Sequence, residues 1–238
     1  MTGSPLFFAI AAGAANLIGA LALTARERWS PRALQTIVAV SAGFLIAVAF
    51  IGLLPHAVER MGERTPAVAL AGYVLVHLTQ HVLGRHFHFG EETHEVSRLT
   101  GLAALVGLLL HTFVDGVAIA SGFGVSPQLG VLVFLAIFLH KVPEGLAITS
   151  LFLASGASRA QALLAATTLA LATVVGAFVT EWVSVVAEYG LAISAGVTLY
   201  VGASNLVPEF QQDRGWRLPL AFVGGCLCYL AAHAVAAG

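Results

Sequence analysis

Residues 111–119 read HTFVDGVAI, and residues 140–148 read HKVPEGLAI. Both stretches follow one pattern, in which a histidine precedes a carboxylate by four residues and Gly, Ala and Ile follow. Residues four apart share one face of a helix, so each copy predicts an imidazole beside a carboxylate. The candidate metal ligands are therefore His111, Asp115, His140 and Glu144.

Both copies lie inside long apolar runs, and the composition of the whole chain agrees with a membrane environment. Of the 238 residues, 58% are hydrophobic and only 10% are charged, whereas a soluble domain has about 25% charged residues. The chain is expected to be an all-α polytopic membrane protein in contact with the lipid bilayer. Ionisable groups at membrane depth are costly and by default mark a substrate or ion pathway. No basic stripe suggests a nucleic acid partner.

Eight apolar runs are each near the ~20 residues that a helix needs to cross a bilayer. They predict transmembrane helices at about residues 5–24, 33–56, 66–84, 99–122, 128–153, 160–183, 190–209 and 217–237. Together they form a single transmembrane domain over residues 1–238, with a His-rich cytoplasmic loop at about 85–98. The first run follows no basic segment, so we interpret it as a span and not as a cleaved signal.

The arginines are distributed unevenly between the two sets of connections. The first, third, fifth and seventh connections contain eight of them, at positions 26, 28, 32, 85, 98, 159, 214 and 217. The opposite set contains only Arg60 and Arg64. By the positive-inside rule, both termini are expected outside the cytoplasm.

A second internal repeat involves the second and seventh runs. The tripeptide SAG at residues 41–43 precedes Pro55, and SAG at residues 194–196 precedes Pro208. The interval from Ser to Pro is 14 residues in both cases, from 41 to 55 and from 194 to 208. These two runs are antiparallel, as are the fourth and fifth, so we expect an inverted 3+2+3 repeat, an arrangement typical of transporters.

The candidate ligands favour borderline divalent metals. Neutral imidazole and carboxylate suit Zn²⁺, Fe²⁺, Mn²⁺ and Cd²⁺, and the set lacks the thiolates that would favour Cu(I). Pro143 lies between two of the candidate ligands and deprives a nearby carbonyl of its helical donor, which also suits a coordination site. An ordinary kinked helix is the alternative reading of this proline.

These motifs resemble the ZIP (Zrt/Irt-like) family of divalent metal transporters, and most closely its GufA-like bacterial members. The resemblance rests on His-x-x-x-Asp-Gly at residues 111–116, HKVPEGLA at 140–147, and Leu-Leu-Pro and Leu-Val-Pro near the ends of the second and seventh runs. It implies a transporter and not an enzyme, in a bacterial inner membrane. It further implies Zn²⁺ or a related ion as the substrate, carried into the cytoplasm by an elevator-like movement of one helix group against another.

Transferred residue by residue, the resemblance implies metal ligation by the four candidates, but the chain departs from the two-metal pattern of some members. The Asn that often follows the first histidine is Thr112, a position that can be Asp is Lys141, and the Glu of the sixth run is absent near Ala172 and Thr173. We therefore expect one transported ion, with Lys141 partly compensating Glu144. Alternatively, Lys141 only pairs with a carboxylate to offset its own burial.

Other polar residues mark possible ends of the ion path. His56 and Glu59 are expected to form an entry funnel and Glu209 an exit relay, with interfacial capping as the alternative. Asn205 is a further residue near this path, although it matches no ligand pattern. His86, His88 and His94 in the loop either bind metal loosely or are simply solvated.

Two other functional classes remain open at this stage, an intramembrane metalloenzyme and a haem-binding electron carrier. The HExxH pattern of the former is missing, and haem ligation does not require a carboxylate one turn from each histidine. The small residues at 11–15 (AAGAA) could also pack helix on helix in a homodimer.

Overall fold

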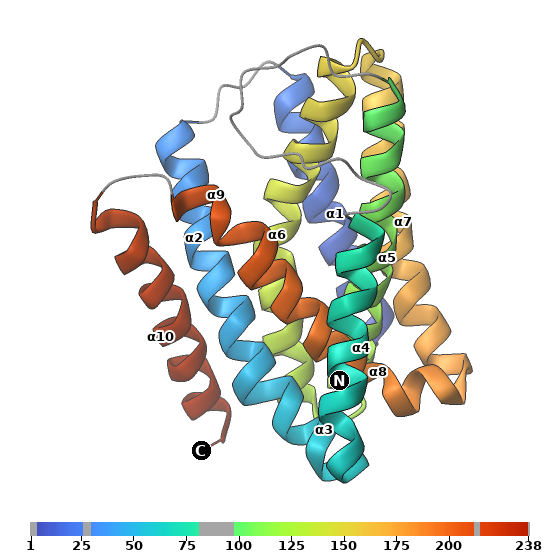
Figure 1. Cartoon of the computed structure of the whole chain (residues 1–238), viewed down its shortest axis with the longest axis vertical. Coiled ribbons are helices and arrows are strands. Elements are labelled where there is room, and N and C mark those ends of the chain that lie inside the picture. Colours follow the sequence, from blue (N-terminus) through green and yellow to red (C-terminus); the bar gives the residue numbers. More distant parts are fainter. Residues whose placement is uncertain (1–3, 26–29, 81–97, 212–214, 238) are drawn as a thin grey trace.

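The computed structural model describes residues 4–25, 30–80, 98–211 and 215–237, and every regular element among them is a helix (Figure 1). Ten are α-helices: α1 (Pro5–Thr24), α2 (Pro31–Ala47), α3 (Leu54–Met61), α4 (Thr65–Leu78), α5 (Arg98–Phe123), α6 (Pro127–Ala154), α7 (Arg159–Trp182), α8 (Ser184–Tyr200), α9 (Pro208–Gln211) and α10 (Arg217–Ala237). Two further elements are π-helices, η1 (Val48–Leu53) and η4 (Val201–Leu206), and η2 (Gly62–Arg64) is a short 3₁₀ helix. The expectation of an all-α chain is confirmed for the described residues.

Local sequence explains where several helices begin. Ser4 caps α1 and Ser126 caps α6, and in both cases a proline occupies the first helical position. Proline suits that position because its missing N–H would have no intrahelical partner there. Ser158 forms a capping box with Gln161 at the start of α7. Such caps satisfy amide groups that the first turn of a helix leaves free.

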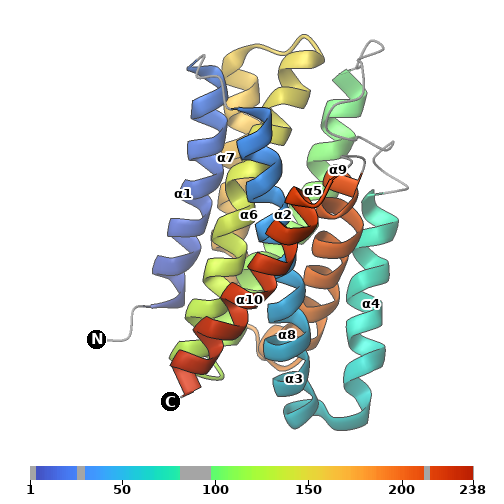
Figure 2. The ribbon, with the colours of Figure 1, turned by 90° about the vertical axis from the view of Figure 1, so that its left-hand side faces the viewer.

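Seven helical stretches in the described part of the chain are long and apolar enough to cross a membrane. They are Pro5–Thr24, Arg32–Leu78, Gly101–Phe123, Pro127–Ala154, Arg159–Trp182, Ser184–Gln211 and Arg217–Val235. The second has 47 residues and reverses direction between α3 and α4 (Figure 2), where Gly62 follows the last residue of α3. Gly62 has φ 61°, a backbone conformation that favours glycine. Beyond the turn, the Thr65 hydroxyl donates a hydrogen bond to the Ala57 carbonyl oxygen at 3.0 Å and holds α3 against α4.

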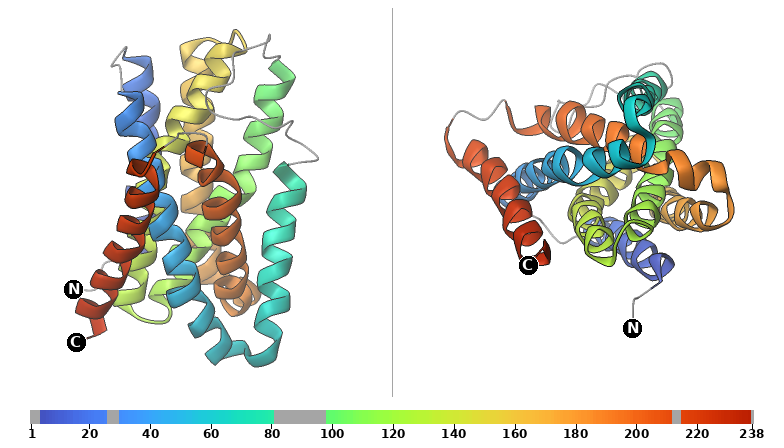
Figure 3. Two further views of the ribbon diagram at one scale, coloured as in Figure 1. Left: turned by 60° about the vertical axis from the view of Figure 1, so that its left-hand side comes forward. Right: turned by 90° about the horizontal axis from the view of Figure 1, so that it is seen from below.

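The helices pack as two groups, visible when the bundle is seen from its end (Figure 3, right). The first, which we call the motif group, consists of α1, α5, α6 and α7 and contains both His-carboxylate motifs. The second, the flanking group, consists of α2, α4, α8 and α10. The groups meet mainly where α5 lies against α8 and where α2 lies against α6. Helix α1 begins and α10 ends at the same end of the bundle (Figure 2).

Reciprocal glycine contacts join helices within each group. A Cβ atom on any of these glycines would overlap a carbonyl oxygen of the neighbouring helix, so only glycine permits the approach. In the motif group, the glycines and the residues whose carbonyls they face are Gly19–Val142 and Gly145–Asn16 between α1 and α6, and Gly116–Thr173 and Gly176–Phe113 between α5 and α7. In the flanking group they are Gly43–Phe222 and Gly225–Val40 between α2 and α10, and Gly72–Ile193 and Gly196–Ala69 between α4 and α8. No described glycine approaches a backbone this closely across the boundary between the groups.

The two π-helices occupy equivalent places in the second internal repeat. In η1 the Leu54 N–H donates to the Ala49 carbonyl, and in η4 the Val207 N–H donates to the Gly202 carbonyl at 3.1 Å. Each donor directly precedes a proline, whose missing N–H interrupts the ordinary helical pattern. Short π-helical segments are frequent at functional sites.

Candidate metal site

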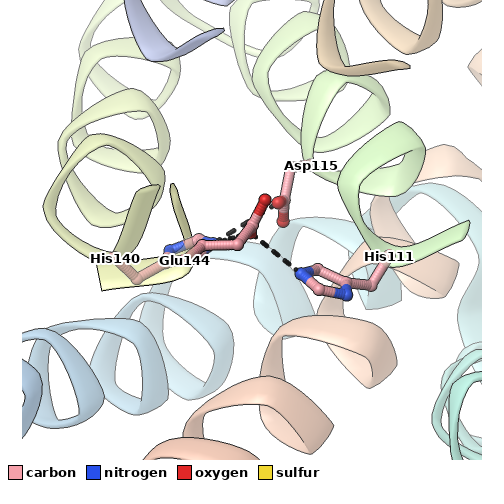
Figure 4. Close-up of side chains that lie close together, drawn as sticks. All are labelled: His111, Asp115, His140 and Glu144. Carbon is pink, nitrogen blue, oxygen red and sulfur yellow. Dashed lines mark hydrogen bonds and ion pairs between the residues drawn. The ribbon is translucent and has the colours of Figure 1, made fainter. Parts of the chain in front are cut away.

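The two motifs face each other from consecutive helices, α5 and α6 (Figure 4). One ligand atom from each of His111, Asp115, His140 and Glu144 can be chosen so that all four atoms lie within 4.8 Å of one another. All four residues are buried, with exposed fractions between 2% and 9%. The structure therefore brings together the four candidate ligands of the two motifs.

The closest imidazole–carboxylate pairs form between the helices and not within them. His111 Nε2 lies 3.1 Å from Glu144 Oε2, and His140 Nε2 lies 3.3 Å from Asp115 Oδ2. The pair within one helix, His140 Nε2 and Glu144 Oε2, is separated by 3.9 Å. The i,i+4 spacing thus orients each motif toward the other helix, and the shortest contacts cross between α5 and α6.

The second ring nitrogen of His140 indicates which tautomer the neutral ring adopts. His140 Nδ1 lies 3.1 Å from the Ala136 carbonyl oxygen, and because a carbonyl only accepts, Nδ1 must donate. In a neutral imidazole, the Nε2 lone pair then faces the Asp115 carboxylate, another acceptor. Two facing acceptors need a proton or a metal ion between them. Metal-binding histidines commonly show this arrangement, in which the other ring nitrogen donates to a carbonyl.

Lys141 supplies a positive charge inside the same cluster. Its side chain is fully buried. Its Nζ lies 2.9 Å from Asp115 Oδ2, and 3.0 Å and 2.9 Å from the two carboxylate oxygens of Glu144. The sequence predicted compensation of Glu144 alone, whereas the ammonium bridges both carboxylates. With neutral histidines, the site has a formal charge of −1.

Two polar residues outside the four candidate ligands also hold Glu144. Asn16 Nδ2 on α1 donates to Glu144 Oε1 at 2.7 Å, and the Thr112 hydroxyl donates to the same oxygen at 3.2 Å. From the sequence, Thr112 was noted only as a departure from a family pattern, and Asn16 was not identified. The available signal was an amide side chain within the apolar run at residues 5–24, because polar residues inside a membrane helix commonly mark functional positions.

The glycine that follows each carboxylate gives a neighbouring helix access to the site. Gly145 follows Glu144 and lies against the Asn16 carbonyl of α1, and Gly116 follows Asp115 and lies against the Thr173 carbonyl of α7. The glycine of each motif therefore lets a neighbouring helix approach beside the carboxylate, α1 at Glu144 and α7 at Asp115. Helix α6 continues without interruption through Pro143.

The remaining residues proposed from the sequence lie outside the four-residue cluster. His56 is half-buried and its Nδ1 contacts the Gly52 carbonyl oxygen at 2.7 Å, while Glu59 is exposed on α3. Asn205 in η4 and Glu209 in α9 are half-buried, and α9 lies well away from α3, which is at the lower end of the bundle in Figure 2. His86, His88 and His94 fall outside the residues that the structure describes.

Comparison with known proteins places these features in a family. The family model described as ZIP zinc transporter matches residues 90–231, more than half of the chain. The chain is 24% identical over 165 residues to zinc transporter YKE4 of Saccharomyces cerevisiae, covering 58% of this chain and 48% of that protein. It is 33% identical over 129 residues to human zinc transporter ZIP4 (53% and 20%), and 29% identical over 168 residues to zinc transporter ZIP9 of Micropogonias undulatus (65% and 54%).

The chain thus spans about half or less of the length of these relatives. The matched family region contains both motifs and the helices α5 and α6 that position them. On this match, the chain belongs to the ZIP zinc transporter family.

Proposed function

We propose that this chain carries divalent transition-metal ions, Zn²⁺ foremost, across a membrane into the cytoplasm. The observation that carries the proposal is the convergence of two imidazoles and two carboxylates in the buried interior of membrane-length helices. Such mixed ligands suit Zn²⁺ and also Fe²⁺, Mn²⁺ and Cd²⁺. The three relatives are each named as zinc transporters, which supports Zn²⁺ as the main substrate.

One ion at a time is the stoichiometry that the local charges favour. Lys141 Nζ already lies within 3.0 Å of oxygens of both Asp115 and Glu144. A second divalent cation beside this ammonium would meet strong repulsion at low dielectric. We therefore assign one transported ion to His111, Asp115, His140 and Glu144, with Lys141 compensating the carboxylates in place of a second ion.

We also infer that the chain crosses the membrane eight times. The stretch Arg32–Leu78 reverses at Gly62, so that α2 with α3 and α4 each count as one crossing, and the two motifs then lie on the fourth and fifth crossings. An even number agrees with α1 beginning and α10 ending at one end of the bundle (Figure 2). The arginine distribution assigns that end to the outside, which fits a bacterial inner membrane protein with both termini extracytoplasmic.

The pairing of helices supports the inverted 3+2+3 repeat. The proposed repeat relates α1 to α7, α5 to α6, α2 to α8 and α4 to α10. Under this relation, the two glycine contacts between α1 and α6 correspond to the two between α7 and α5. The two contacts between α2 and α10 likewise correspond to the two between α8 and α4. The two π-helices before Pro55 and Pro208 correspond in the same way.

This packing also favours an elevator-like carrier over a fixed channel. The backbones interlock through glycines inside the motif group and inside the flanking group. At the boundary, contacts such as that of Gly190 with the Ser121 side chain involve side chains instead. Two rigid bodies with a side-chain interface can slide, so the motif group is proposed to carry the ion past the flanking group.

The other readings gain less support from the structure. Both imidazoles lie against carboxylates of the opposite helix, an arrangement that axial haem ligation does not require, and the family match speaks against an intramembrane enzyme. The small residues proposed for a homodimer include Gly13, which packs inside the chain against Ala170 of α7. The GufA-like affiliation and the homodimer stay predictions from the sequence.

Uptake by proteoliposomes tests the proposed function. Wild-type protein is expected to import Zn²⁺ and, more slowly, other metals of the set, whereas His140→Ala and Glu144→Ala should import no more than empty liposomes. Thr149→Val is the matched control, because Thr149 is buried on the same helix but belongs to no contact of the site. Absence of uptake of all four metals by wild type would contradict the proposal.

A further inference from the structure

A third helix reaches the metal site through Asn16 of α1. This residue has no exposed surface, and its Nδ2 donates to Glu144 Oε1 at 2.7 Å, the shortest of the contacts that Glu144 makes. Its other amide atom, Oδ1, is buried without a hydrogen-bond partner in the described structure. A buried acceptor left without a partner costs free energy, and such exceptions are expected where a side chain is aimed for function.

The backbone fixes Asn16 in this position. Its carbonyl oxygen lies against Gly145, the residue after Glu144, and Gly19 lies against the Val142 carbonyl one turn away on the same two helices. Helices α1 and α6 are therefore locked in register at the level of Glu144. Because the close contact between α1 and α6 fixes the backbone of Asn16, its amide group restricts the orientation of the Glu144 carboxylate.

The contacts of Glu144 divide between its two oxygens. Oε1 accepts from Asn16 and Thr112, while Oε2 faces His111 Nε2 at 3.1 Å and His140 Nε2 at 3.9 Å. Lys141 contacts both oxygens. Only Oε2 therefore faces the imidazoles with which it would share an ion.

We propose that Asn16 is a positioning residue for transport, which holds Glu144 Oε1 so that Oε2 is presented to the metal ion. This inference rests on the proposed function of the site. Thr173, which lies against Gly116 after the other carboxylate, provides no equivalent hold. Its hydroxyl contacts the Leu169 carbonyl of its own helix at 3.5 Å. The site is thus asymmetric, with one carboxylate oriented by an amide from a third helix.

Two substitutions at this position are expected to raise the KM for Zn²⁺, and one of them leaves the shape of the side chain unchanged. Asn16→Ala removes a hydrogen bond to a charged group, which corresponds to roughly a tenfold rise in KM. Asn16→Asp keeps the shape but replaces the Nδ2 donor by an oxygen that repels Glu144 Oε1, so Glu144 loses its hold and KM should rise at least as much. A role in packing alone predicts the wild-type KM for the isosteric Asn16→Asp.

The experiment measures Zn²⁺ uptake by proteoliposomes together with equilibrium Zn²⁺ binding to the purified full chain in detergent. Thr173→Ala is the control at the repeat-related position and should keep the wild-type KM. Wild-type KM and Kd in Asn16→Asp, whether or not Asn16→Ala changes them, would overturn the inference.

The two measurements also separate this inference from the proposed function. If wild type imports Zn²⁺ and His140→Ala does not, the function stands whatever the Asn16 variants show. If wild type binds Zn²⁺ without importing it, the transport proposal fails, but the Kd of the two variants still decides the role of Asn16. Should Asn16→Ala not fold, the isosteric Asn16→Asp carries the test through its higher Kd.

Discussion

Replacing Lys141 with methionine should make the stability of the protein depend on bound zinc. In the wild type, the Lys141 ammonium lies 2.9 Å from Asp115 Oδ2 and within 3.0 Å of both Glu144 oxygens, and all three side chains are buried. Methionine retains most of the volume of the side chain but removes the charge. Removing one partner of a buried ion pair costs about 3–5 kcal/mol of unfolding free energy. For a chain of this size, that corresponds to a fall of about 10 °C in Tm in the absence of metal.

Zinc should reverse most of this loss. The formal charge of the site changes from −1 to −2 when Lys141 is removed, so the variant should bind Zn²⁺ more tightly than the wild type. Zinc at 100 times its Kd stabilises a folded protein by about 2.7 kcal/mol. The wild type should gain less at the same zinc concentration, because its ammonium already occupies the space between the carboxylates.

The assay is thermal unfolding in detergent, followed by loss of the monodisperse protein peak, with either EDTA or added Zn²⁺. The double variant Lys141→Met with Asp115→Asn returns the formal charge to −1, so it should recover part of the Tm measured in EDTA. If Lys141→Met melts at the wild-type temperature in EDTA, or if Zn²⁺ raises the Tm of both proteins equally, the assigned role of Lys141 is wrong.

Three further predictions concern packing, motion and the loop. Gly145→Ala should lower uptake and stability because its Cβ would overlap the Asn16 carbonyl, whereas Gly224→Ala, which meets no atom within 4 Å, should leave both unchanged. Ser121→Cys with Gly190→Cys, in a background lacking Cys226 and Cys228, should form a disulfide between the two helix groups, since a Cβ on Gly190 would lie 3.6 Å from that of Ser121. Oxidation should then block uptake, reduction should restore it, and unchanged uptake by the oxidised protein would argue against sliding groups. Deleting residues 86–95 should leave basal uptake measurable if that segment regulates transport, and complete loss in a folded protein would contradict this.

Local patterns were sufficient to predict that the chain is helical and which motif side chains come together. The apolar runs near membrane length correspond to long helices in the described part of the chain. The repeated spacing of His and carboxylate identified the four side chains that converge. Such features depend on residues a few positions apart, which is the range over which helical periodicity acts.

Contacts between distant helices were not predictable in the same way. Asn16 and Glu144 are 128 positions apart, and their contact depends on how closely Gly19 and Gly145 let α1 approach α6. The pairing of His111 with Glu144 and of His140 with Asp115 likewise depends on the distance between two facing helices. A sequence contains the residues that permit these approaches, but not the interhelical distances that result.

The buried charges of the site also bear on the return step of the proposed carrier. Such a carrier crosses with its site full and returns with the site free of metal, and two uncompensated carboxylates in lipid would make the return step costly. We expect Lys141 to reduce that cost, because its ammonium neutralises one of the two negative charges in the metal-free state. The same ammonium opposes metal binding, so the loss of Lys141 should strengthen binding and slow turnover together. Tight binding and fast return make opposing demands on such a site, and on this proposal Lys141 balances them.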